Sequence, residues 1–567
     1  MTPSDILRRY LESQQLGQDD WDEISAPTAS LENDPLLIKD SRLWLNTLHS
    51  HRHDVITIVG DYDADGILAS SVMHRGLDIL GIGSKINVYV PTRLDGYGIS
   101  ETSVDKVQAQ FPDTQTVITV DNGISAEAGV VKAIGLGWTV LVTDHHLALN
   151  KTLNKATATV DINRQDDTYP FKHISGTAMA FKMLQAYARV VRPDKLDEIN
   201  TLRLRVGIST ITDMMVLRHE NRYWVKYAIE AVQNYVNNKH GADDDFHIRI
   251  LTDVLVANKG IWGGKVDADT FGFSIGPILN SSSRVTGTPE LAYRFFESHD
   301  VDEATALAQE LIDMNAKRKQ IIGLESDKAK KRVDTALSEK KGMASYIQTV
   351  PLASGFVGLV AGSLSRAYNA PSIVFSTVDF DGRELSGTDV IHGSARSPEG
   401  LSIVAILTRI DELSPELLVT YGGHAGAGGV AIVADDLNTF RDYFNQAVAE
   451  IAKESTFTPV DNNIVVDVHD VTPELINALN YMAPYGMGFP KPMFVVKDVP
   501  KNVTKMGANK QHIKFSVRPD FEIIDWNGAE RYDEHQSEVL TCQGHLGFGT
   551  TFRGRTPIQM IVDDWLV

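Results

Sequence analysis

The chain has 567 residues, too many for one hydrophobic core, and this length indicates about three or four domains. Its composition, with 43% hydrophobic and 23% charged residues, excludes collagen-like, low-complexity and disordered chains. A formal net charge of −20 argues weakly against a protein coated with nucleic acid, although phosphate contact depends on where the basic residues gather. The single cysteine, Cys542, excludes an internal disulfide, and we find neither a signal-like start nor an apolar run of membrane-spanning length. We therefore expect a cytoplasmic protein without membrane contact.

The first half of the chain predicts a short helical segment followed by an α/β domain. Residues 1–50 are acidic and helical in character, and strands alternate with helices within residues 51–300. The strands expected from short apolar, β-branched runs are residues 55–59, 86–90, 117–120, 139–143 and 158–160. Such alternation predicts a parallel, doubly wound sheet, in which ligands bind beyond the carboxyl ends of the strands.

Three polar motifs directly follow three of these strands. They are Asp61-Tyr62-Asp63-Ala64-Asp65, then Asp121-Asn122, then Asp144-His145-His146. Three alternating aspartates repel one another unless a cation offsets their charge. A lone motif of this kind is usually a solvated turn or a structural histidine pair, but three of them at strand ends favour a metal site.

The pattern fits two divalent cations that hydrolyse a phosphoester. A site of this kind needs hard oxygen ligands, a bridging carboxylate and imidazole, with the ions about 3.5–4 Å apart. Asp63 and Asp65 are the natural pair, one for each ion, and Asp121 is placed to bridge them. His145 could bind one ion, which leaves His146 to contact the phosphate or the leaving oxygen. Asp144 could fix a histidine tautomer.

The second half of the chain predicts a connector and two smaller domains. Residues 301–342 have the pattern of one long helix with a basic second half, as in a solvent-bridging connector. Residues 343–455 form a second α/β unit that contains the glycine-rich run 422–429. This run lacks the lysine and hydroxyl of a phosphate loop. Residues 460–567 show short strands with turn signals, as a small barrel would.

A basic segment stands out in this acidic chain. Residues 491–518 contain seven Lys or Arg residues and one acid, Asp498. Such a strip fits contacts with a nucleic-acid backbone, although a charge run is usually only a solvated face. The nucleic-acid-binding candidates are Lys505, Lys510, Lys514, Arg553 and Arg555. Possible stacking faces are Tyr485, Phe489, Phe494 and Phe515, although most aromatic residues of strands belong to a core.

The three polar motifs resemble the signature of the DHH phosphoesterases, and nearly the whole chain is similar to their RecJ family of single-strand-specific 5′→3′ exonucleases. The resemblance implies a parallel-sheet DHH domain, a long connecting helix, a smaller α/β DHH-associated domain and a C-terminal OB-like β-barrel. It places Asp61 in the catalytic signature. Residues 210–214 with Asn221-Arg222 resemble the fourth motif, which implies that Asp213 is a further metal ligand.

The resemblance also implies substrate contacts outside the three motifs. Residues 276–284 resemble the next motif, which usually has Ala-Ala-Gly where this chain has three serines at 281–283. Asn280 and Arg284 are retained, so a phosphate contact by Arg284 is implied. In the DHH-associated domain the residues implied to touch the substrate are Ser394, Arg396, Ser397, Gly423 and His424. The alternative for the glycine-rich run is a tight turn that His424 caps.

The resemblance implies an exonuclease that degrades single-stranded DNA from its 5′ end to nucleoside 5′-monophosphates, in DNA repair or recombination. Attack by a metal-bridging water would be assisted by His146 and Arg284, with two Mn²⁺ or Mg²⁺ ions as cofactors. The implied partners are a single-strand-binding protein and a helicase, and we expect a monomer. One alternative is a DHH enzyme for short RNA oligonucleotides or cyclic dinucleotides. Another is a non-catalytic replication scaffold of the same fold.

Overall fold

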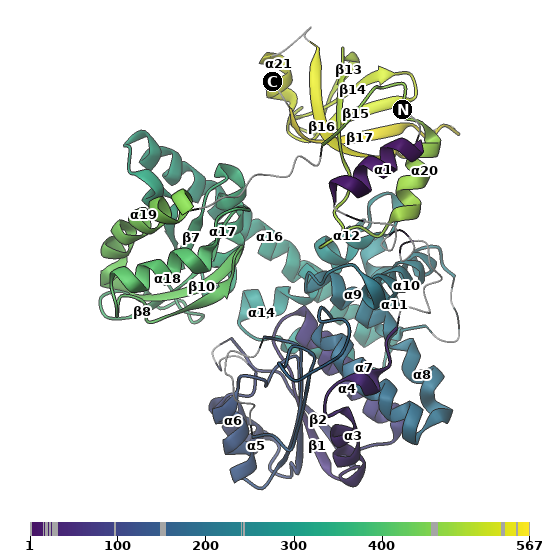
Figure 1. Cartoon of the computed structure of the whole chain (residues 1–567), viewed down its shortest axis with the longest axis vertical. Helices are drawn as coiled ribbons and strands as arrows, with labels where there is room; N and C mark the ends of the chain where they lie inside the picture. Colours follow the sequence, from purple (N-terminus) through teal and green to yellow (C-terminus); the bar gives the residue numbers. More distant parts are fainter. Residues whose placement is uncertain are drawn as a thin grey trace.

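The structure is a computed structural model, and it describes residues 3–14, 16, 21, 24, 32–93, 95, 98–147, 155–239, 241, 244–454, 463–534, 539–551 and 554–565. Figure 1 shows three domains and a long helix, α16, that runs between two of them. Within the described residues, no helix is both long and apolar enough to span a bilayer.

The first domain is built on a five-stranded parallel sheet. Its strand order is β2-β1-β3-β4-β5. The strands are β1 (Val55–Val59), β2 (Lys85–Tyr89), β3 (Thr116–Val120), β4 (Thr139–Asp144) and β5 (Ala158–Asp161). The predicted parallel sheet is confirmed. The order reverses between β1 and β3, and this is the position at which open α/β sheets bind their ligands.

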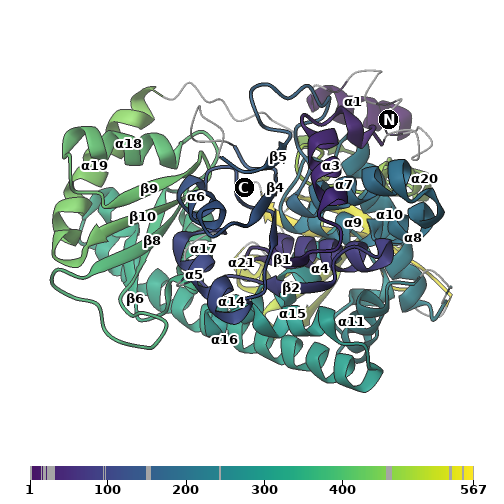
Figure 2. The same ribbon diagram turned by 90° about the horizontal axis from the view of Figure 1, so that it is seen from below.

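Helices cover both faces of this sheet, as Figure 2 shows. On one face β-branched strand residues pack against α4 (Ala64–Leu80), α7 (Gly176–Val191) and α3 (Ser41–Ser50). On the other face lie α5 (Glu101–Gln110) and α6 (Glu127–Gly135). With both faces covered, the strands are almost entirely apolar, which explains their short uninterrupted β-branched runs.

A helical layer completes the first domain beside α4. Its helices are η2 (Pro35–Leu37), η3 (Pro193–Lys195), α8 (Leu196–Thr201), α9 (Arg203–Thr212), α10 (His219–Val236), α11 (Phe246–Ala257), η4 (Trp262–Gly264), α12 (Ala268–Thr270), η5 (Phe271–Ile275), α13 (Gly276–Leu279), α14 (Ser281–Thr286) and α15 (Glu290–Glu297). The apolar residues of α9, α10, α11, η5, α13 and α15 form a second core together with Ile67 and Leu68 of α4, whereas η2 and α8 pack on the core of the sheet.

The long helix α16 (Val301–Ser338) connects the first domain to the second. Its start is capped by Asp300, whose carboxylate accepts the backbone N–H groups of Asp302 and Glu303, both at 3.0 Å. Leu307 and Leu311 belong to the core of the first domain, whereas Ala329 and Val333 pack against α17 (Ser354–Tyr368) of the second. The expected connecting helix is confirmed.

The second domain has a mixed five-stranded sheet of order β6-β7-β8-β10-β9. Its elements are η6 (Gly342–Tyr346), β6 (Ile347–Val350), α17 (Ser354–Tyr368), β7 (Ser372–Ser376), β8 (Val390–Arg396), α18 (Ile403–Leu413), β9 (Thr420–His424), β10 (Ala427–Val433), η7 (Ala434–Asp436) and α19 (Leu437–Glu454). The run 422–429 therefore forms parts of the β9–β10 hairpin, and β9 is at the sheet edge.

The C-terminal domain contains a seven-stranded sheet of order β11-β12-β16-β17-β15-β14-β13. Its elements are β11 (Asn463–Val466), α20 (Pro473–Met482), β12 (Met493–Asp498), β13 (Lys501–Met506), β14 (His512–Arg518), β15 (Phe521–Asp525), α21 (Ala529–Glu534), β16 (Leu540–Phe548) and β17 (Ile558–Trp565).

The N-terminal segment is divided between two domains, which differs from the single helical segment expected for residues 1–50. Helix α1 (Pro3–Ser13) lies beside α20, and its Ile6 and Tyr10 are buried in the core of the C-terminal domain. Helix α3 instead packs on the sheet of the first domain. The reason is that each helix buries its apolar side on a different neighbour, and sequence periodicity does not identify that neighbour.

Candidate active site

The three predicted polar motifs meet at the carboxyl edge of the first sheet. Asp63 caps α4, and its carboxylate accepts the N–H of Gly66 at 3.0 Å. A Cβ at Gly66 would lie 2.5 Å from the carbonyl oxygen of Asp61, so only glycine permits this close turn. Asp121 follows β3 across the switch point, and Asp144 ends β4. The strand topology therefore gathers these carboxylates.

His145 lies among the carboxylates of several elements. Its Nε2 atom is 3.0 Å from Oδ1 of Asp121, 3.6 Å from Oδ2 of Asp213 and 3.8 Å from Oδ2 of Asp65. The structure thus adds Asp213, from the end of α9, to the motifs of the sheet edge. Three triads have donor atoms within 4.8 Å of one another: Asp61, Asp63 and Asp121; Asp65, His145 and Asp213; and Asp121, His145 and His146.

The start of α7 holds the side chain of Asp65 in place. The carboxylate of Asp65 accepts hydrogen bonds from the N–H groups of Gly176 and Thr177, at 2.7 and 2.9 Å, and from the hydroxyl groups of Thr177 and Ser209. These supporting residues were not predicted from the sequence, because they come from segments with no charged motif. Asn122, which the motif includes, donates to the carbonyl oxygens of Val59 and Gly60 and so ties the ends of β1 and β3 together.

The buried carboxylates fit a divalent cation. Burial, followed by repulsion from Asp63, raises the pKa of Asp61 well above its ordinary value. Burial and the charges of Asp65 and Asp63 do the same for the pKa of Asp121 and of Asp213. Oδ1 of Asp61 and Oδ2 of Asp213 are buried and accept no hydrogen bond within the described part of the chain. Clustered carboxylates with one imidazole are a donor set suited to Mn²⁺ or Mg²⁺.

His146 differs from His145 in its surroundings. Its Nδ1 atom is 2.8 Å from Oδ1 of Asp144, and its side chain is 44% exposed. Although burial opposes the charged form, the hydrogen bond to Asp144 and its charge raise the pKa of His146 to about 9. Burial lowers the pKa of His145 instead. The pair therefore combines a neutral imidazole, suited to a metal, with a cationic one at the surface.

Arginine side chains gather beside the carboxylates. Arg284 on α14 donates to the carbonyl oxygen of Gly355 at 3.0 Å, and burial together with Arg93 and Arg318 lowers its pKa to about 10. The guanidinium of Arg93 lies 4.4 Å from the ring centroid of Tyr62. Arg93 was not predicted from the sequence, although it follows β2 in the way that the three motifs follow their strands.

Asn280 and the three serines have structural contacts. Oδ1 of Asn280 accepts the N–H of Ala64 at 3.0 Å, so this oxygen holds the first turn of α4. The hydroxyl groups of Ser281, Ser282 and Ser283 donate to the carbonyl oxygens of Ile278, Thr288 and Asn280. Their polar groups are therefore satisfied inside the motif that usually has Ala-Ala-Gly.

The second domain places Ser394 and Arg396 close to the contact between Arg284 and α17. Nη1 of Arg396 donates to Oγ of Ser394 at 2.8 Å. A Cβ at Gly358 would lie 3.0 Å from both side chains, and Gly358 is one turn along α17 from Gly355, which contacts Arg284. Oγ of Ser397 is buried and has no hydrogen-bond partner within the described residues. Gly423 and His424 are exposed on β9, two strands away from β8.

The basic strip of the C-terminal domain is partly neutralised. Lys514 pairs with Glu522 at 3.1 Å, and Lys505 pairs with Asp533 at 2.5 Å. Among the described residues Lys510 and Arg555 form no ion pair, and Arg553 lies outside the described residues. Phe489, Phe494 and Phe515 are buried in the core of the domain, so the alternative of core aromatics holds for these three and not the stacking role. Tyr485 is half-buried, and its hydroxyl donates to the carbonyl oxygen of Leu479.

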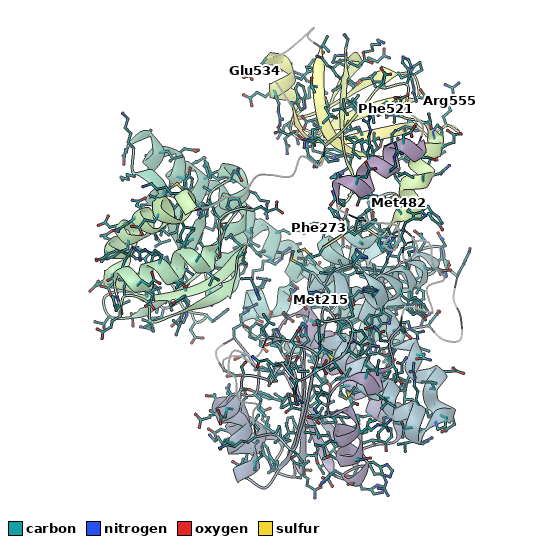
Figure 3. The ribbon with its side chains drawn as sticks, viewed as in Figure 1. Met215, Phe273, Met482, Phe521, Glu534 and Arg555 are labelled. Carbon is teal, nitrogen blue, oxygen red and sulfur yellow. The ribbon has the colours of Figure 1, made fainter. Side chains whose placement is uncertain are left out.

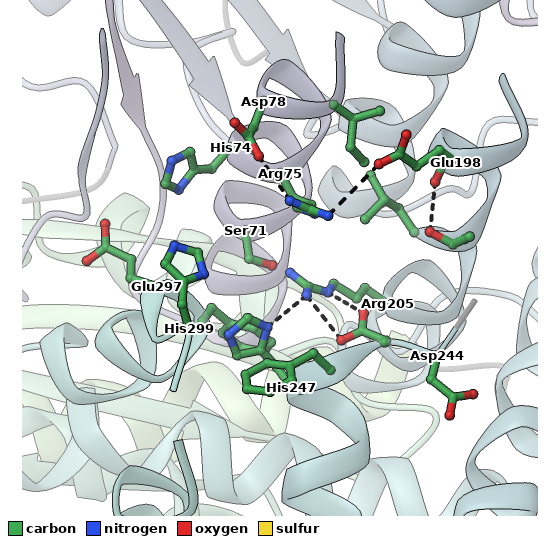
Figure 4. A pocket seen from close by; sticks show the side chains of 16 residues that line it. Ser71, His74, Arg75, Asp78, Glu198, Arg205, Asp244, His247, Glu297 and His299 are labelled. Atoms are coloured by element: carbon green, nitrogen blue, oxygen red, sulfur yellow. Dashed lines mark hydrogen bonds and ion pairs between the residues drawn. The ribbon is translucent and has the colours of Figure 1, made fainter. Parts of the chain in front are cut away.

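A separate cavity of about 340 Å³ lies along the second half of α4, between α4, α8, α9, α11 and α15. Figure 4 shows that its charged side chains face one another. Arg75 pairs with Asp78 at 2.9 Å, and Arg205 pairs with Asp245 at 2.6 Å. None of the predicted site residues lines this cavity, so it is distinct from the carboxylate cluster.

Comparisons with known proteins agree with this geometry. Family models match three stretches: the DHH family N-terminal domain at residues 55–207, the DHHA1 domain at 348–450 and the RecJ OB domain at 463–564. These matches confirm the predicted combination of DHH, DHH-associated and OB-like domains.

Curated relatives extend the likeness over most of the chain. The single-stranded-DNA-specific exonuclease RecJ of Escherichia coli K12 is 30% identical over 533 residues, which are 90% of this chain and 87% of that protein. The RecJ of Bacillus subtilis 168 is 31% identical over 524 residues, and the match covers 90% of this chain but 61% of that longer protein.

Two crystal structures share the fold. RecJ from Thermus thermophilus with Mn²⁺ has a TM-score of 0.75 at 22% identity, and the match covers 100% of this chain and 78% of that one. An exonuclease RecJ bound to manganese has a TM-score of 0.57 at 25% identity, and the match covers 75% of this chain and 98% of that one. With its three matched domains and a 30% identical relative covered over most of its length, this chain belongs to the RecJ family within the DHH phosphoesterases.

Proposed function

We propose that this chain is a metal-dependent exonuclease that degrades single-stranded DNA from its 5′ end to nucleoside 5′-monophosphates. The observation that supports it best is the cluster of buried carboxylates around His145 at the carboxyl edge of the sheet. Relatives that match over 90% of this chain are named single-stranded-DNA-specific exonucleases.

The residues of the cluster could hold two cations. Asp61, Asp63 and Asp121 would hold one, and Asp65, His145 and Asp213 would hold the other. Oδ1 of Asp121 is also 3.0 Å from Nε2 of His145, which supports the bridging role for Asp121. Bound Mn²⁺ or Mg²⁺ would activate water and offset the charge of the reacting phosphate.

His146 and the arginines would act on the phosphate itself. Asp144 holds the imidazole of His146 by Nδ1 and keeps it charged, so the ring can donate to a phosphate or leaving oxygen at pH 7. The fork of a guanidinium matches phosphate oxygens, and Arg284 and Arg93 lie beside the Asp61–Asp65 motif. Arg396 and Ser394 extend this cationic surface into the second domain.

The rest of the strand would contact the second and C-terminal domains. Ser397, Gly423 and His424 remain proposed contacts, as do Lys505, Lys510, Lys514, Arg553 and Arg555. Backbone-tracking contacts of this kind require little sequence recognition. The same proposal includes a monomeric enzyme in the cytoplasm that works with a single-strand-binding protein and a helicase.

A product assay tests the proposal. DNA and RNA strands labelled at either end are incubated with Mn²⁺, Mg²⁺ or a chelator, and the products are resolved by size and by the position of their phosphate. We expect 5′-mononucleotides released from the 5′ end of DNA and no release with the chelator. Hydrolysis of short RNA alone would favour the small-substrate alternative, and metal-independent or absent hydrolysis would overturn the proposal.

A further inference from the structure

The segment that follows Asp213 packs directly against the C-terminal domain. After α9 the chain turns through Met214, whose φ is 55°, and runs as an irregular segment to Arg218. The N–H of Leu217 donates to the carbonyl oxygen of Met487 at 2.8 Å. Figure 3 shows the labelled Met215 in the first domain below Met482 of the C-terminal domain.

Two glycines let the C-terminal domain approach this segment closely. Residues 483–490 form a turn that is closed by hydrogen bonds between Gly486 and Phe489, at 2.9 and 3.1 Å. A Cβ at Gly486 would lie 2.8 Å from Cδ1 of Leu217, and a Cβ at Gly488 would lie 2.7 Å from Cγ1 of Val216. The backbone of the C-terminal domain at these two glycines therefore packs directly against the side chains of Leu217 and Val216, and no space is left there for a methyl group.

Arg222, which belongs to the first domain, holds the turn of the C-terminal domain in place. Its buried guanidinium donates to the carbonyl oxygens of Met482, Ala483 and Pro484, the last at 2.8 Å. It also lies 4.9 Å from the ring centroid of Phe489, on which Tyr485 stacks at 5.5 Å. Asn221, the preceding residue, donates to the carbonyl oxygen of Val216 at 2.9 Å. Adjacent residues of α10 thus hold both partners of the contact.

We infer that Arg222 and the turn 483–490 are a positioning device for Asp213, so that the C-terminal domain forms part of the metal centre as well as a surface for DNA. The inference rests on the proposed function, in which Asp213 is a metal ligand. The physical reason is that Asp213 ends α9 and is followed at once by the irregular segment 214–218, so the packing of that segment limits where its carboxylate can lie. Supporting contacts of metal ligands typically alter metal affinity about 10- to 100-fold when they are lost.

The test compares alanine substitutions at two glycines with similar positive φ. Gly488 has φ 69° and Gly554 has φ 76°, both in the C-terminal domain, but a Cβ at Gly554 meets nothing within 4 Å. Mn²⁺ binding is followed by electron paramagnetic resonance, and kcat is measured on a dinucleotide, which is chosen to avoid the basic strip of the C-terminal domain. We expect Gly488→Ala to weaken Mn²⁺ binding about tenfold and to lower kcat, while Gly554→Ala leaves both unchanged.

The outcomes separate this inference from the proposed function. If the wild-type protein binds no Mn²⁺, the proposed function fails. If the wild-type protein binds Mn²⁺ and Gly488→Ala behaves like Gly554→Ala, the positioning role is overturned and the proposed function stands.

Should Gly488→Ala fail to fold, Arg222→Lys is measured instead. We expect this substitution to weaken Mn²⁺ binding and to increase hydrogen exchange in residues 212–217, with Arg222→Met showing the larger effect. Unchanged Mn²⁺ binding and unchanged exchange in a folded Arg222→Met protein would equally overturn the inference.

Discussion

Asp121 shows how a single residue of this site is held in an unfavourable state. It has a φ of 63°, in the left-handed region that asparagine and aspartate tolerate better than most residues. Its carboxylate is buried among other acids, and this raises its pKa. Before metal binds, the ionised cluster therefore destabilises the fold, and a bound cation removes that cost.

Asp121→Asn should separate stability from activity. Asparagine keeps the shape and tolerates the same φ, but it removes one negative charge from the cluster. We expect the metal-free protein to gain about 1 kcal/mol or more of unfolding free energy, while hydrolysis falls by roughly a thousandfold or more. Thermal unfolding in chelator and the product assay measure the two effects. A variant that loses stability in chelator would contradict this expectation.

His247, in the separate cavity, should make stability depend on pH. Burial and the nearby Arg205 lower its pKa to about 4, although Asp245 opposes the shift. Unfolded chains bind the proton near pH 6.5, so the contribution is complete above that pH and is lost as pH falls toward 4. This contribution to the free energy of unfolding is about 3 kcal/mol at most. Denaturant unfolding of His247→Gln should show a flatter pH dependence between 4 and 6.5, and His53→Gln, at an exposed position, should match wild type.

At the scale of elements, the amino end of α7 orients one carboxylate of the acidic cluster, that of Asp65. Ser175 caps this helix, and the N–H groups of its first two residues point at Asp65. A helix amino end favours a negative charge, so α7 stabilises a carboxylate that its neighbours repel. The helix thereby orients a ligand that lies 111 residues earlier in the chain.

Gly176→Ala should damage the metal site without removing a ligand. A Cβ at Gly176 would lie 2.4 Å from Oδ1 of Asp121, so that carboxylate must move. We expect Mn²⁺ affinity to fall at least about tenfold with a small change in melting temperature. Gly135→Ala is the control, because its Cβ meets nothing within 4 Å. Equal Mn²⁺ affinities in the two variants would show that Asp121 is not held by this contact.

At the scale of the whole molecule, the two chain ends and the catalytic edge are linked. Helix α1 is buried against the C-terminal domain, whose turn 483–490 contacts the segment after Asp213. Helix α16 joins the first domain to the second, where Arg396 lies beside the contact of Arg284 with Gly355. All three domains therefore border the cluster or the segments that shape it.

The salt dependence of hydrolysis should depend on substrate length. Long strands would displace counterions from basic residues of all three domains, whereas a dinucleotide reaches only the metal edge. We expect kcat/KM for a long strand to fall steeply between about 50 and 200 mM salt, by about tenfold or more, and that for a dinucleotide to change far less. Replacing Lys510 and Arg555 by alanine should flatten the first slope. Equal slopes for both substrates would argue against the C-terminal contacts.

Several features of the site follow from local pattern alone. The runs of β-branched residues place strand ends, and parallel strands bring their carboxyl ends to one edge, so Asp61–Asp65, Asp121 and His145 could be assigned together. Asp213 needed the family resemblance, because a polar residue at a helix end gives no pattern of its own. Arg93, Gly176 and Ser209 were not predicted, since their roles depend on which loop faces which strand.

The C-terminal domain marks the limit of prediction from composition. Its basic strip was evident in the sequence, but only the tertiary structure shows that Lys505 and Lys514 face acids from other elements. Hydrophobic periodicity depends on residues close together in the chain, so the sequence alone predicted a parallel α/β sheet with an acidic edge, whereas the order of its strands came from the structure. The contact of Arg222 with residues 482–484 joins two separate cores that lie far apart in the chain. It depends on how those cores pack together, so it could be found only in the tertiary structure.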